Sequence, residues 1–242
     1  MTTRPSSTTP LPEMYGTLGV SARRLAAGEG PDGDAGGDLY GIVDTPYGTR
    51  LLIGDVMGKG AELTRTADEV LRTWRRLACV QRTLEVLAVR LHSLVAHSEE
   101  PDRFVTATLV TVAPDGSAEV VCCGHPPPLL IRSGAAVPAA VPAPAPPLGL
   151  LDLAHGWCGA EQISASAWER MLLHTDGASE ARDADGAFYP LAERATELST
   201  LPLAPFTAAL SADLLHHAGG RLQDDATLLA LEPAKSLPPV SS

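Results

Sequence analysis

Hydrophobic and polar residues follow one another along the chain in a way that predicts short strands joined by tight turns. Hydrophobic runs at 39–44 and 50–53 flank the turn sequence Pro46-Tyr47-Gly48, so these runs are expected to pair as a β-hairpin. The second run stops at Asp55, which has glycines nearby on both sides and lies where the backbone can bend sharply. Because hairpin strands are antiparallel, Asp38 at the start of the first strand is expected beside Asp55 at the end of the second.

Two longer segments carry hydrophobic residues three and four positions apart, which predicts amphipathic helices at 61–79 and 83–97. Thr83 is a suitable N-cap for the second helix. An Ala/Pro-rich segment at 135–147 is expected to be a loop with polyproline character. The remaining hydrophobic runs predict strands at 104–112, 118–123, 126–131, 157–163, 170–174 and 226–231, and helices at 191–198 and 205–217.

Composition narrows the class of protein. A chain of 242 residues favours one large domain, here 13–232, between a disordered N-terminal tail at 1–12 and a C-terminal tail at 233–242. The formal net charge of −11 disfavours nucleic acid and anionic membranes as partners. Four cysteines without CxxC spacing argue against zinc and thioredoxin chemistry. No signal sequence and no run of about 18 apolar residues is visible, so we expect a cytoplasmic protein with reduced thiols.

Four acidic positions share one context, a strand end beside a turn. They are Asp38, Asp55, Asp176 and the pair Asp224-Asp225. A single such residue can simply bond its own backbone, but four of them suggest one convergent cluster. Neighbouring carboxylates raise one another's pKa unless a cation neutralises them. Oxygen ligands without His or Cys favour Mg²⁺ or Mn²⁺ over zinc. Two such ions about 3.5–4 Å apart can activate water and clamp a phosphoryl group.

Seven motifs occur along the chain in a fixed order. They are Gly36-Gly37-Asp38-Leu39-Tyr40, Gly54-Asp55-Val56-Met57-Gly58-Lys59-Gly60, Arg103-Phe104-Val105-Thr106-Ala107, Gly124-His125-Pro126-Pro127-Pro128, Pro147-Leu148-Gly149, His174-Thr175-Asp176-Gly177 and Asp224-Asp225-Ala226-Thr227. With this ordered set the chain, over roughly 18–231, resembles the SpoIIE-like bacterial branch of the PPM (protein phosphatase 2C) serine/threonine phosphatases. The resemblance implies an α+β fold, the PPM-type αββα sandwich of two packed antiparallel sheets flanked by helices.

The resemblance also implies the roles of the acids. Asp55 would bridge two Mn²⁺ or Mg²⁺ ions, and the Val56 carbonyl would help to hold one of them. Asp38 would serve the second ion, while Asp176 and Asp224 would serve the first, with Asp225 as the alternative to Asp224. Asp38, Asp55 and Asp176 are thus the predicted catalytic residues. A metal-bound water would attack phosphoserine or phosphothreonine in line, without a phosphoenzyme.

Partners are implied in the same way. Members of this family commonly act in signalling on a phosphorylated anti-sigma-factor antagonist. The helices predicted at 61–79 and 83–97 commonly form a regulatory switch and a dimer contact, so a homodimer is expected there. The eukaryotic phosphate-binding arginine has no matched position, so Arg23 and Arg24 are candidate phosphate contacts. Lys59 is either a further phosphate contact or an exposed turn lysine.

Several positions depart from the usual family motifs. Gly41 stands where many relatives carry an acid, Cys122-Cys123 precede Gly124 in place of Asn-Ala, and His174 replaces a common tyrosine. None of these changes removes a predicted metal ligand.

Other interpretations remain open. His125 is either a general acid or a structural histidine that bonds a loop backbone. The 54–60 segment is not a P-loop, because its glycine spacing is short and Gly60 replaces the Ser or Thr. Gly36-Gly37-Asp38 is similar to the diguanylate cyclase signature, but that assignment gives Asp176 and Asp224 no role. The leading hypothesis is a metal-dependent phosphoprotein phosphatase, a hydrolase of phosphoric monoesters. The alternatives are a non-catalytic regulatory docking module and a phosphatase of small phosphate esters.

Overall fold

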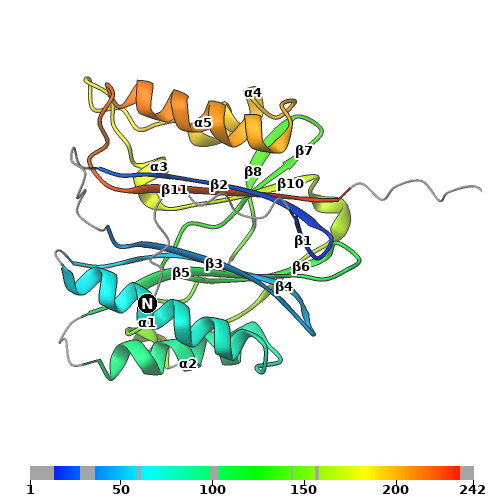
Figure 1. Ribbon diagram of the computed structural model, residues 1–242, viewed down its shortest axis with the longest axis vertical. Helices are drawn as coiled ribbons and strands as arrows, with labels where there is room; N and C mark the ends of the chain where they lie inside the picture. Colours follow the sequence, from blue (N-terminus) through cyan, green and yellow to red (C-terminus); the bar gives the residue numbers. More distant parts are fainter. Residues whose placement is uncertain are drawn as a thin grey trace, which may run out of the picture.

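Two antiparallel sheets lie face to face in the computed structural model, and helices cover both outer faces (Figure 1). The structure describes residues 14–27, 36–58, 61–98, 103–142, 144–155 and 158–234. Sheet A has the order β1 (Met14–Tyr15), β2 (Leu18–Leu25), β11 (Ala226–Pro233), β10 (Arg170–His174), β7 (Leu129–Arg132), β8 (Ala135–Pro138). Sheet B has the order β3 (Asp38–Thr45), β4 (Gly48–Val56), β5 (Val105–Val112), β6 (Ala118–Cys123), β9 (Glu161–Ile163).

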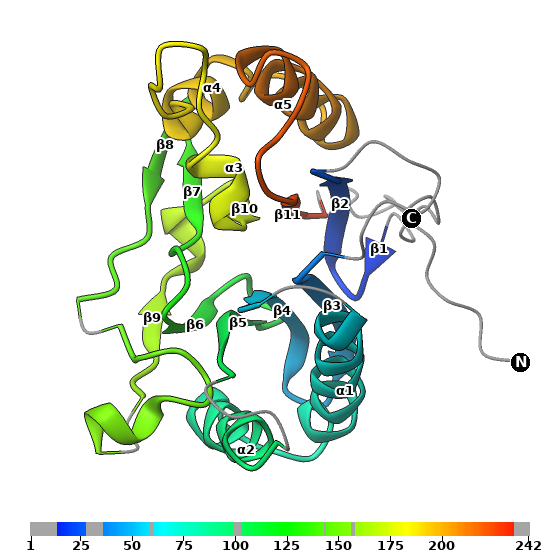
Figure 2. The same cartoon turned by 90° about the vertical axis from the view of Figure 1, so that its left-hand side faces the viewer.

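Figure 2 shows the helices on both sides of the two sheets. Helices α1 (Ala61–Ala78) and α2 (Leu84–Ala96) pack on sheet B, whereas α4 (Leu191–Glu197) and α5 (Leu203–His217) pack on sheet A. The short helix α3 (Asp176–Ser179) follows β10, and 3₁₀ turns occupy Leu151–Ala154 and Ala165–Ala167. The αββα sandwich is therefore confirmed.

Both faces of the central strands are buried, which explains continuous hydrophobic runs such as Leu51-Leu52-Ile53 in β4. In β4, Leu51 and Ile53 belong to the layer between the sheets, while Leu52 belongs to the layer beneath α1 and α2. Trp74 of α1 is fully buried in that outer layer. A third apolar layer lies between sheet A and helices α4 and α5. Successive side chains of a strand point to opposite faces, so each strand joins two of these layers.

The guanidinium group of a buried arginine stabilises the turn between α1 and α2. Arg50 of β4 is 1% exposed, and its guanidinium donates to the carbonyl oxygens of Ala78, Gln81 and Arg82 at 2.8, 2.6 and 2.8 Å. These carbonyls belong to the end of α1 and the connection to α2, where helical partners are missing. Arg50 therefore anchors the helix pair to β4, the strand that carries Asp55. The predicted cap is also confirmed, since Thr83 Oγ1 accepts from the Val86 amide at 3.4 Å.

Most predicted elements are confirmed, and three needed correction. The predicted loop at 135–147 begins with strand β8, which pairs with β7 as an edge strand. The strand predicted at 126–131 starts only at Leu129, because the preceding prolines cannot donate hydrogen bonds to a sheet. The strand predicted at 157–163 is limited to Glu161–Ile163 within the described residues. Strand β2 was not predicted at all.

The predicted N-terminal tail at 1–12 and most of the predicted C-terminal tail lie outside the described residues. Strand β11 continues to Pro233, and the Ala234 amide donates to Thr17 O at 2.7 Å, so the folded region extends slightly past the predicted boundary at 232. In the described part of the chain, no helix combines the length and the hydrophobicity that crossing a bilayer requires.

Candidate active site

The four predicted acidic positions meet at one end of the sandwich. In sheet B, Asp38 and Asp55 are direct partners in the β3–β4 register. In sheet A, Asp176 follows β10 and Asp224 precedes β11, and these two strands are antiparallel neighbours. Each sheet therefore contributes two acids from adjacent strand ends, as the hairpin argument predicted for the first pair.

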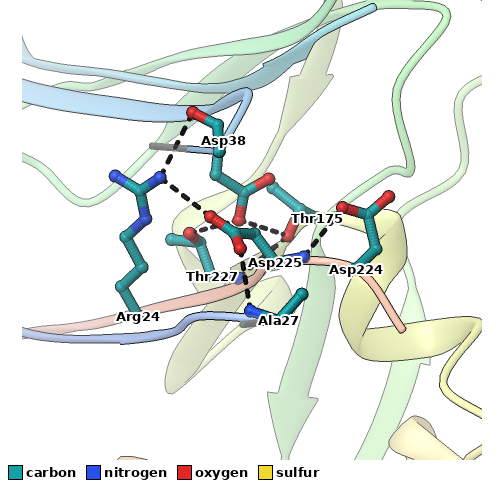
Figure 3. Close-up of polar contacts among 8 residues, drawn as sticks. Arg24, Ala27, Asp38, Thr175, Asp224, Asp225 and Thr227 are labelled. Carbon is teal, nitrogen blue, oxygen red and sulfur yellow. Dashed lines mark hydrogen bonds and ion pairs between the residues drawn. The ribbon is translucent and has the colours of Figure 1, made fainter. Parts of the chain in front are cut away.

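A hydrogen-bonded contact joins the two sheets at this point (Figure 3). Oδ2 of Asp38 accepts from the hydroxyls of Thr175 at 3.0 Å and Thr227 at 2.6 Å. The Asp38 residue is 5% exposed, and its pKa is raised to about 8, mainly by burial and in part by the nearby charge of Asp55. The two hydroxyls oppose this rise because they stabilise the ionised form.

The pKa of Asp55 in sheet B is affected by the acids at the strand ends of sheet A. This pKa is raised to about 7, first by burial and then by the negative charges of Asp176, Asp224 and Asp225. The pKa of Asp224 is also raised, first by burial and then by the charges of Asp176 and Asp225. The acids thus interact through space although they come from distant parts of the sequence. Such a cluster favours a bound cation.

The backbone before Asp38 passes very close to Asp55. The Val56 amide donates to Gly37 O at 3.1 Å. A Cβ atom on Gly37 would collide with Asp55 Oδ1 and would lie 2.6 Å from Val56 O. Glycine is therefore required at position 37, because any side chain would displace the carboxylate and the carbonyl that are the predicted ligands.

Asp224 and Asp225 have different surroundings. Asp225 Oδ2 pairs with Arg24 Nη2 at 2.9 Å, and Asp225 Oδ1 accepts from the Ala27 amide at 2.9 Å (Figure 3). Asp224 Oδ1 accepts from the amide of Asp225 at 2.8 Å, a local turn contact. Asp225 therefore uses both oxygens to hold Arg24 and the end of β2, which favours Asp224 as the predicted ligand.

The three candidate phosphate contacts are placed differently. Arg24 lies at the acids, where it pairs with Asp225 and also donates to Gly36 O at 3.3 Å. Arg23 is the register partner of Leu228, which belongs to the layer under α5, so the alternation of β2 puts Arg23 on the opposite face of sheet A. The structure does not bring Arg23 to the cluster. Lys59 lies outside the described residues.

His125 is a structural histidine in this arrangement. Its Nε2 lies 3.1 Å from the carbonyl oxygen of His174, which can only accept, so Nε2 carries the hydrogen. Its Nδ1 then accepts from Thr106 Oγ1 at 3.0 Å. Burial lowers the pKa of His125 to about 3, so the ring is neutral near pH 7. A neutral ring with both nitrogens engaged is unsuited to be the general acid, and the backbone-bonding interpretation holds.

The position of Gly41 explains one departure from the family motifs. Gly41 lies on β3, and a Cβ atom there would be 2.5 Å from Cζ3 of Trp74. The residue therefore makes room for the Trp74 ring beneath α1 and takes no part in the acidic cluster.

Sequence reasoning missed the threonines of the site, Thr106, Thr175 and Thr227. Each lies inside one of the quoted motifs, and Thr175 directly precedes a predicted ligand. Buried β-branched residues in strands are usually assigned to packing, so their hydroxyls gave no separate signal.

The donor set is compatible with a hard divalent cation. The available groups are carboxylates and the Val56 carbonyl, which are the oxygen ligands that Mg²⁺ and Mn²⁺ prefer. Among the described residues, no three acidic, His or Cys side chains converge closely enough to enclose one ion. The acids therefore lie near one another, but those that the structure describes do not form a closed ligand shell, and their assignment as metal ligands stays a prediction.

Two packed antiparallel sheets, paired helices outside each sheet and acids at one end between the sheets define the PPM-type serine/threonine phosphatase fold. The sequence model described as Stage II sporulation protein E (SpoIIE) matches residues 45–233. The chain belongs to the SpoIIE family, a branch of these phosphatases.

Solved structures agree with this fold. The RsbU and RsbW domains of Rv1364c from Mycobacterium tuberculosis align with a TM-score of 0.75 at 22% identity, covering 91% of this chain and 61% of that chain. The PP2C phosphatase domain of SpoIIE from Bacillus subtilis, with a fragment of its regulatory domain, gives 0.71 at 16% identity, covering 91% and 64%. The SiaA PP2C domain of Pseudomonas aeruginosa gives 0.72 at 15% identity, covering 88% and 85%. The chain thus spans less than two thirds of the first two of these structures.

Proposed function

We propose that this protein is a Mn²⁺- or Mg²⁺-dependent serine/threonine phosphoprotein phosphatase that uses water as the nucleophile. The observation that carries the proposal is the grouping of Asp38 and Asp55 from sheet B with Asp176 and Asp224 from sheet A. The raised pKa values of Asp38 and Asp55 support it, because these carboxylates are costly to ionise without a cation.

Each acid has a defined part in this proposal. Asp55 would contact both ions, with the Val56 carbonyl on one of them. Asp38 would hold the second ion, and Asp176 with Asp224 would hold the first. Bound divalent ions lower the pKa of water and neutralise the charge of a phosphate group. Arg24 remains a candidate phosphate contact. Among the candidate side chains that the structure describes, it is the one that lies beside the acids.

The test is hydrolysis of p-nitrophenyl phosphate and of a phosphoserine peptide with MnCl₂, comparing wild type with Asp55→Asn and Asp176→Asn. Each variant is expected to lose at least about 100-fold in kcat, the size seen when one charge-stabilising group is removed. Asp68→Asn on the exposed face of α1 is the matched control and should keep wild-type rates. Manganese-dependent turnover retained in both site variants would contradict the assignment.

The substrate we propose is a phosphorylated regulatory protein of the anti-sigma-factor-antagonist type, acting in the cytoplasm. The proposed substrate is supported by the family membership and by a structural neighbour that contains RsbU and RsbW domains. The proposed compartment is supported by the free thiols of all four cysteines. Comparing kcat/KM on a phosphoserine peptide with that on sugar and nucleotide phosphates separates this function from the small-ester alternative. The docking alternative would instead show partner binding that is equal in EDTA and MnCl₂, with no turnover.

The second part of the proposal is a homodimer. Its contact would be formed by α1 and α2, the helices predicted at 61–79 and 83–97. On α2, Val86 and Val89 are 44% and 38% exposed, and Glu85 and Arg90 flank them. A twofold axis between positions 87 and 88 would place Val86 on Val89 of a second copy and Glu85 beside its Arg90. Such a self-complementary patch suits a closed dimer. Light scattering should show a dimer that Val86→Glu dissociates, whereas a monomeric wild type would refute it.

A further inference from the structure

The two carboxylate oxygens of Asp38 are in different situations. Both threonine hydroxyls donate to Oδ2, from Thr227 at 2.6 Å and from Thr175 at 3.0 Å. The Thr175 hydroxyl oxygen also accepts from the Thr227 amide at 2.9 Å. The single hydrogen of that hydroxyl is therefore free to point at Asp38. Neither hydroxyl engages the other oxygen, Oδ1 (Figure 3).

The three residues form a buried, hydrogen-bonded unit that bridges the sheets. Thr175 and Thr227 are 0% exposed and are further joined by a bond of 3.1 Å from the Thr175 amide to Thr227 O. Both belong to sheet A, since Thr175 directly follows β10 and Thr227 lies within β11. Asp38 is the first residue of β3 in sheet B. The contact therefore fixes where an acid of one sheet stands relative to the strand ends that carry Asp176 and Asp224.

The buried hydroxyls of Thr175 and Thr227 could find hydrogen-bond acceptors without converging on Asp38. A buried threonine can bond a backbone carbonyl of its own segment, as Thr207 does with Ala204 O at 3.1 Å. Here two hydroxyls from neighbouring strands converge on one oxygen atom of a third strand. The terminal torsion of an aspartate is otherwise broad, so two donors on one oxygen select a single orientation of the carboxylate.

We propose that Thr175 and Thr227 are positioning residues that hold Asp38 by Oδ2, so that Asp38 ligates its cation through Oδ1 alone. This inference rests on the proposed metal-dependent function. Partners of this kind behind a metal ligand set its orientation, and their loss typically weakens metal binding by about 10- to 100-fold.

The test is calorimetric titration of the metal-free full chain with Mn²⁺, independent of turnover. Thr227→Val keeps the shape of the side chain and removes the donor, and about 10-fold or greater weakening of Mn²⁺ binding is expected. Thr227→Ser keeps the hydroxyl and should bind Mn²⁺ with nearly wild-type affinity. Thr207→Val is the matched control, because Thr207 is also 0% exposed but contacts Ser21 at the α5 face of sheet A. Circular dichroism in EDTA verifies that each variant is folded.

Steady-state kinetics adds a second measurement. Thr227→Val should need more Mn²⁺ for half-maximal activity, while kcat at saturating Mn²⁺ recovers towards wild type. Equal Mn²⁺ affinity in Thr227→Val and Thr207→Val would overturn the inference, and so would a folded Thr227→Ser that fails to restore binding. In both cases a wild type that binds Mn²⁺ and hydrolyses substrate leaves the proposed function intact. A wild type that binds no Mn²⁺ or Mg²⁺ would instead overturn the proposed function and this inference together.

Discussion

The acidic site should oppose folding of the metal-free protein as the pH rises, and Asp38 should account for much of this effect. Burial raises the pKa of Asp38 from 3.8 to about 8. The folded chain therefore holds this proton more tightly than the unfolded chain does. By linkage, the stabilisation is fully present below about pH 4 and is lost as the pH rises through the folded-state pKa of about 8.

The size of the effect follows from the same pKa. At about 1.36 kcal/mol per pKa unit, a rise from 3.8 to about 8 corresponds to a loss on the order of 5 kcal/mol. About 3 to 4 kcal/mol of this loss falls between pH 5 and pH 8. Typical domains have a free energy of unfolding of about 5–15 kcal/mol, so the change is a large fraction of the total. The raised pKa of Asp55 acts in the same direction.

Urea unfolding in EDTA at several pH values, followed by circular dichroism, measures this directly. Asp38→Asn cannot ionise, and its amide oxygen can still accept from both threonines. The difference in unfolding free energy between wild type and Asp38→Asn should therefore move in favour of the variant by about 3 kcal/mol from pH 5 to pH 8. Adding MnCl₂ at pH 8 should stabilise wild type more than the variant. Asp68→Asn should show no such trend, and a pH-independent difference for Asp38→Asn would refute the reasoning.

Three further predictions concern other parts of the site and its support. Gly37→Ala should abolish Mn²⁺ binding measured by calorimetry, because its Cβ would displace the Asp55 carboxylate, whereas Gly19→Ala, with 3.5 Å to its nearest neighbour, should bind normally. Nitrogen-15 NMR should find His125 as the Nε2–H tautomer, unchanged between pH 5 and pH 8; an imidazolium signal near pH 6 would contradict its buried, neutral assignment. Arg50→Met should lower the free energy of unfolding, measured in urea, by about 3 kcal/mol or more, because buried carbonyls lose their hydrogen-bond donor. A change under about 1 kcal/mol would show that water replaces the guanidinium as the donor.

The sequence predicted those parts of the fold in which both faces of a strand are buried or a helix has one apolar face. The hairpin around Tyr47 and the paired helices followed directly from such patterns. Strand β2 was missed because only its inner face near Leu18 and Val20 is fully buried, and its later positions, such as Arg23 and Arg24, are exposed. Strand β8 was missed because Ala and Pro have low β-propensity and its pairing with β7 is set by tertiary context.

The site was predictable to the extent that it depends on strand ends. Asp38 beside Asp55 followed from antiparallel pairing alone, because the register of a hairpin is local. The approach of Asp176 and Asp224 to that pair depends on how two separate sheets pack, which no short-range pattern contains. Consecutive strands even change sheets, since β6 belongs to sheet B and β7 to sheet A. The order of motifs supplied this long-range information through resemblance, but it could not show which hydroxyl or amide each acid accepts from.

The division of the acids between two sheets has an energetic consequence. Repulsion among ionised carboxylates acts across the interface that holds the sandwich together, so in the metal-free state the same charges oppose the packing of the sheets. A cation that binds only the folded chain reverses this effect, and at 1,000 times its dissociation constant it adds about 4 kcal/mol of stability. The hydroxyls of Thr175 and Thr227 resist the repulsion without a metal, because they tie Asp38 of one sheet to the strands of the other. Because this contact already joins the two sheets without an ion, we expect metal binding to require little rearrangement of Asp38.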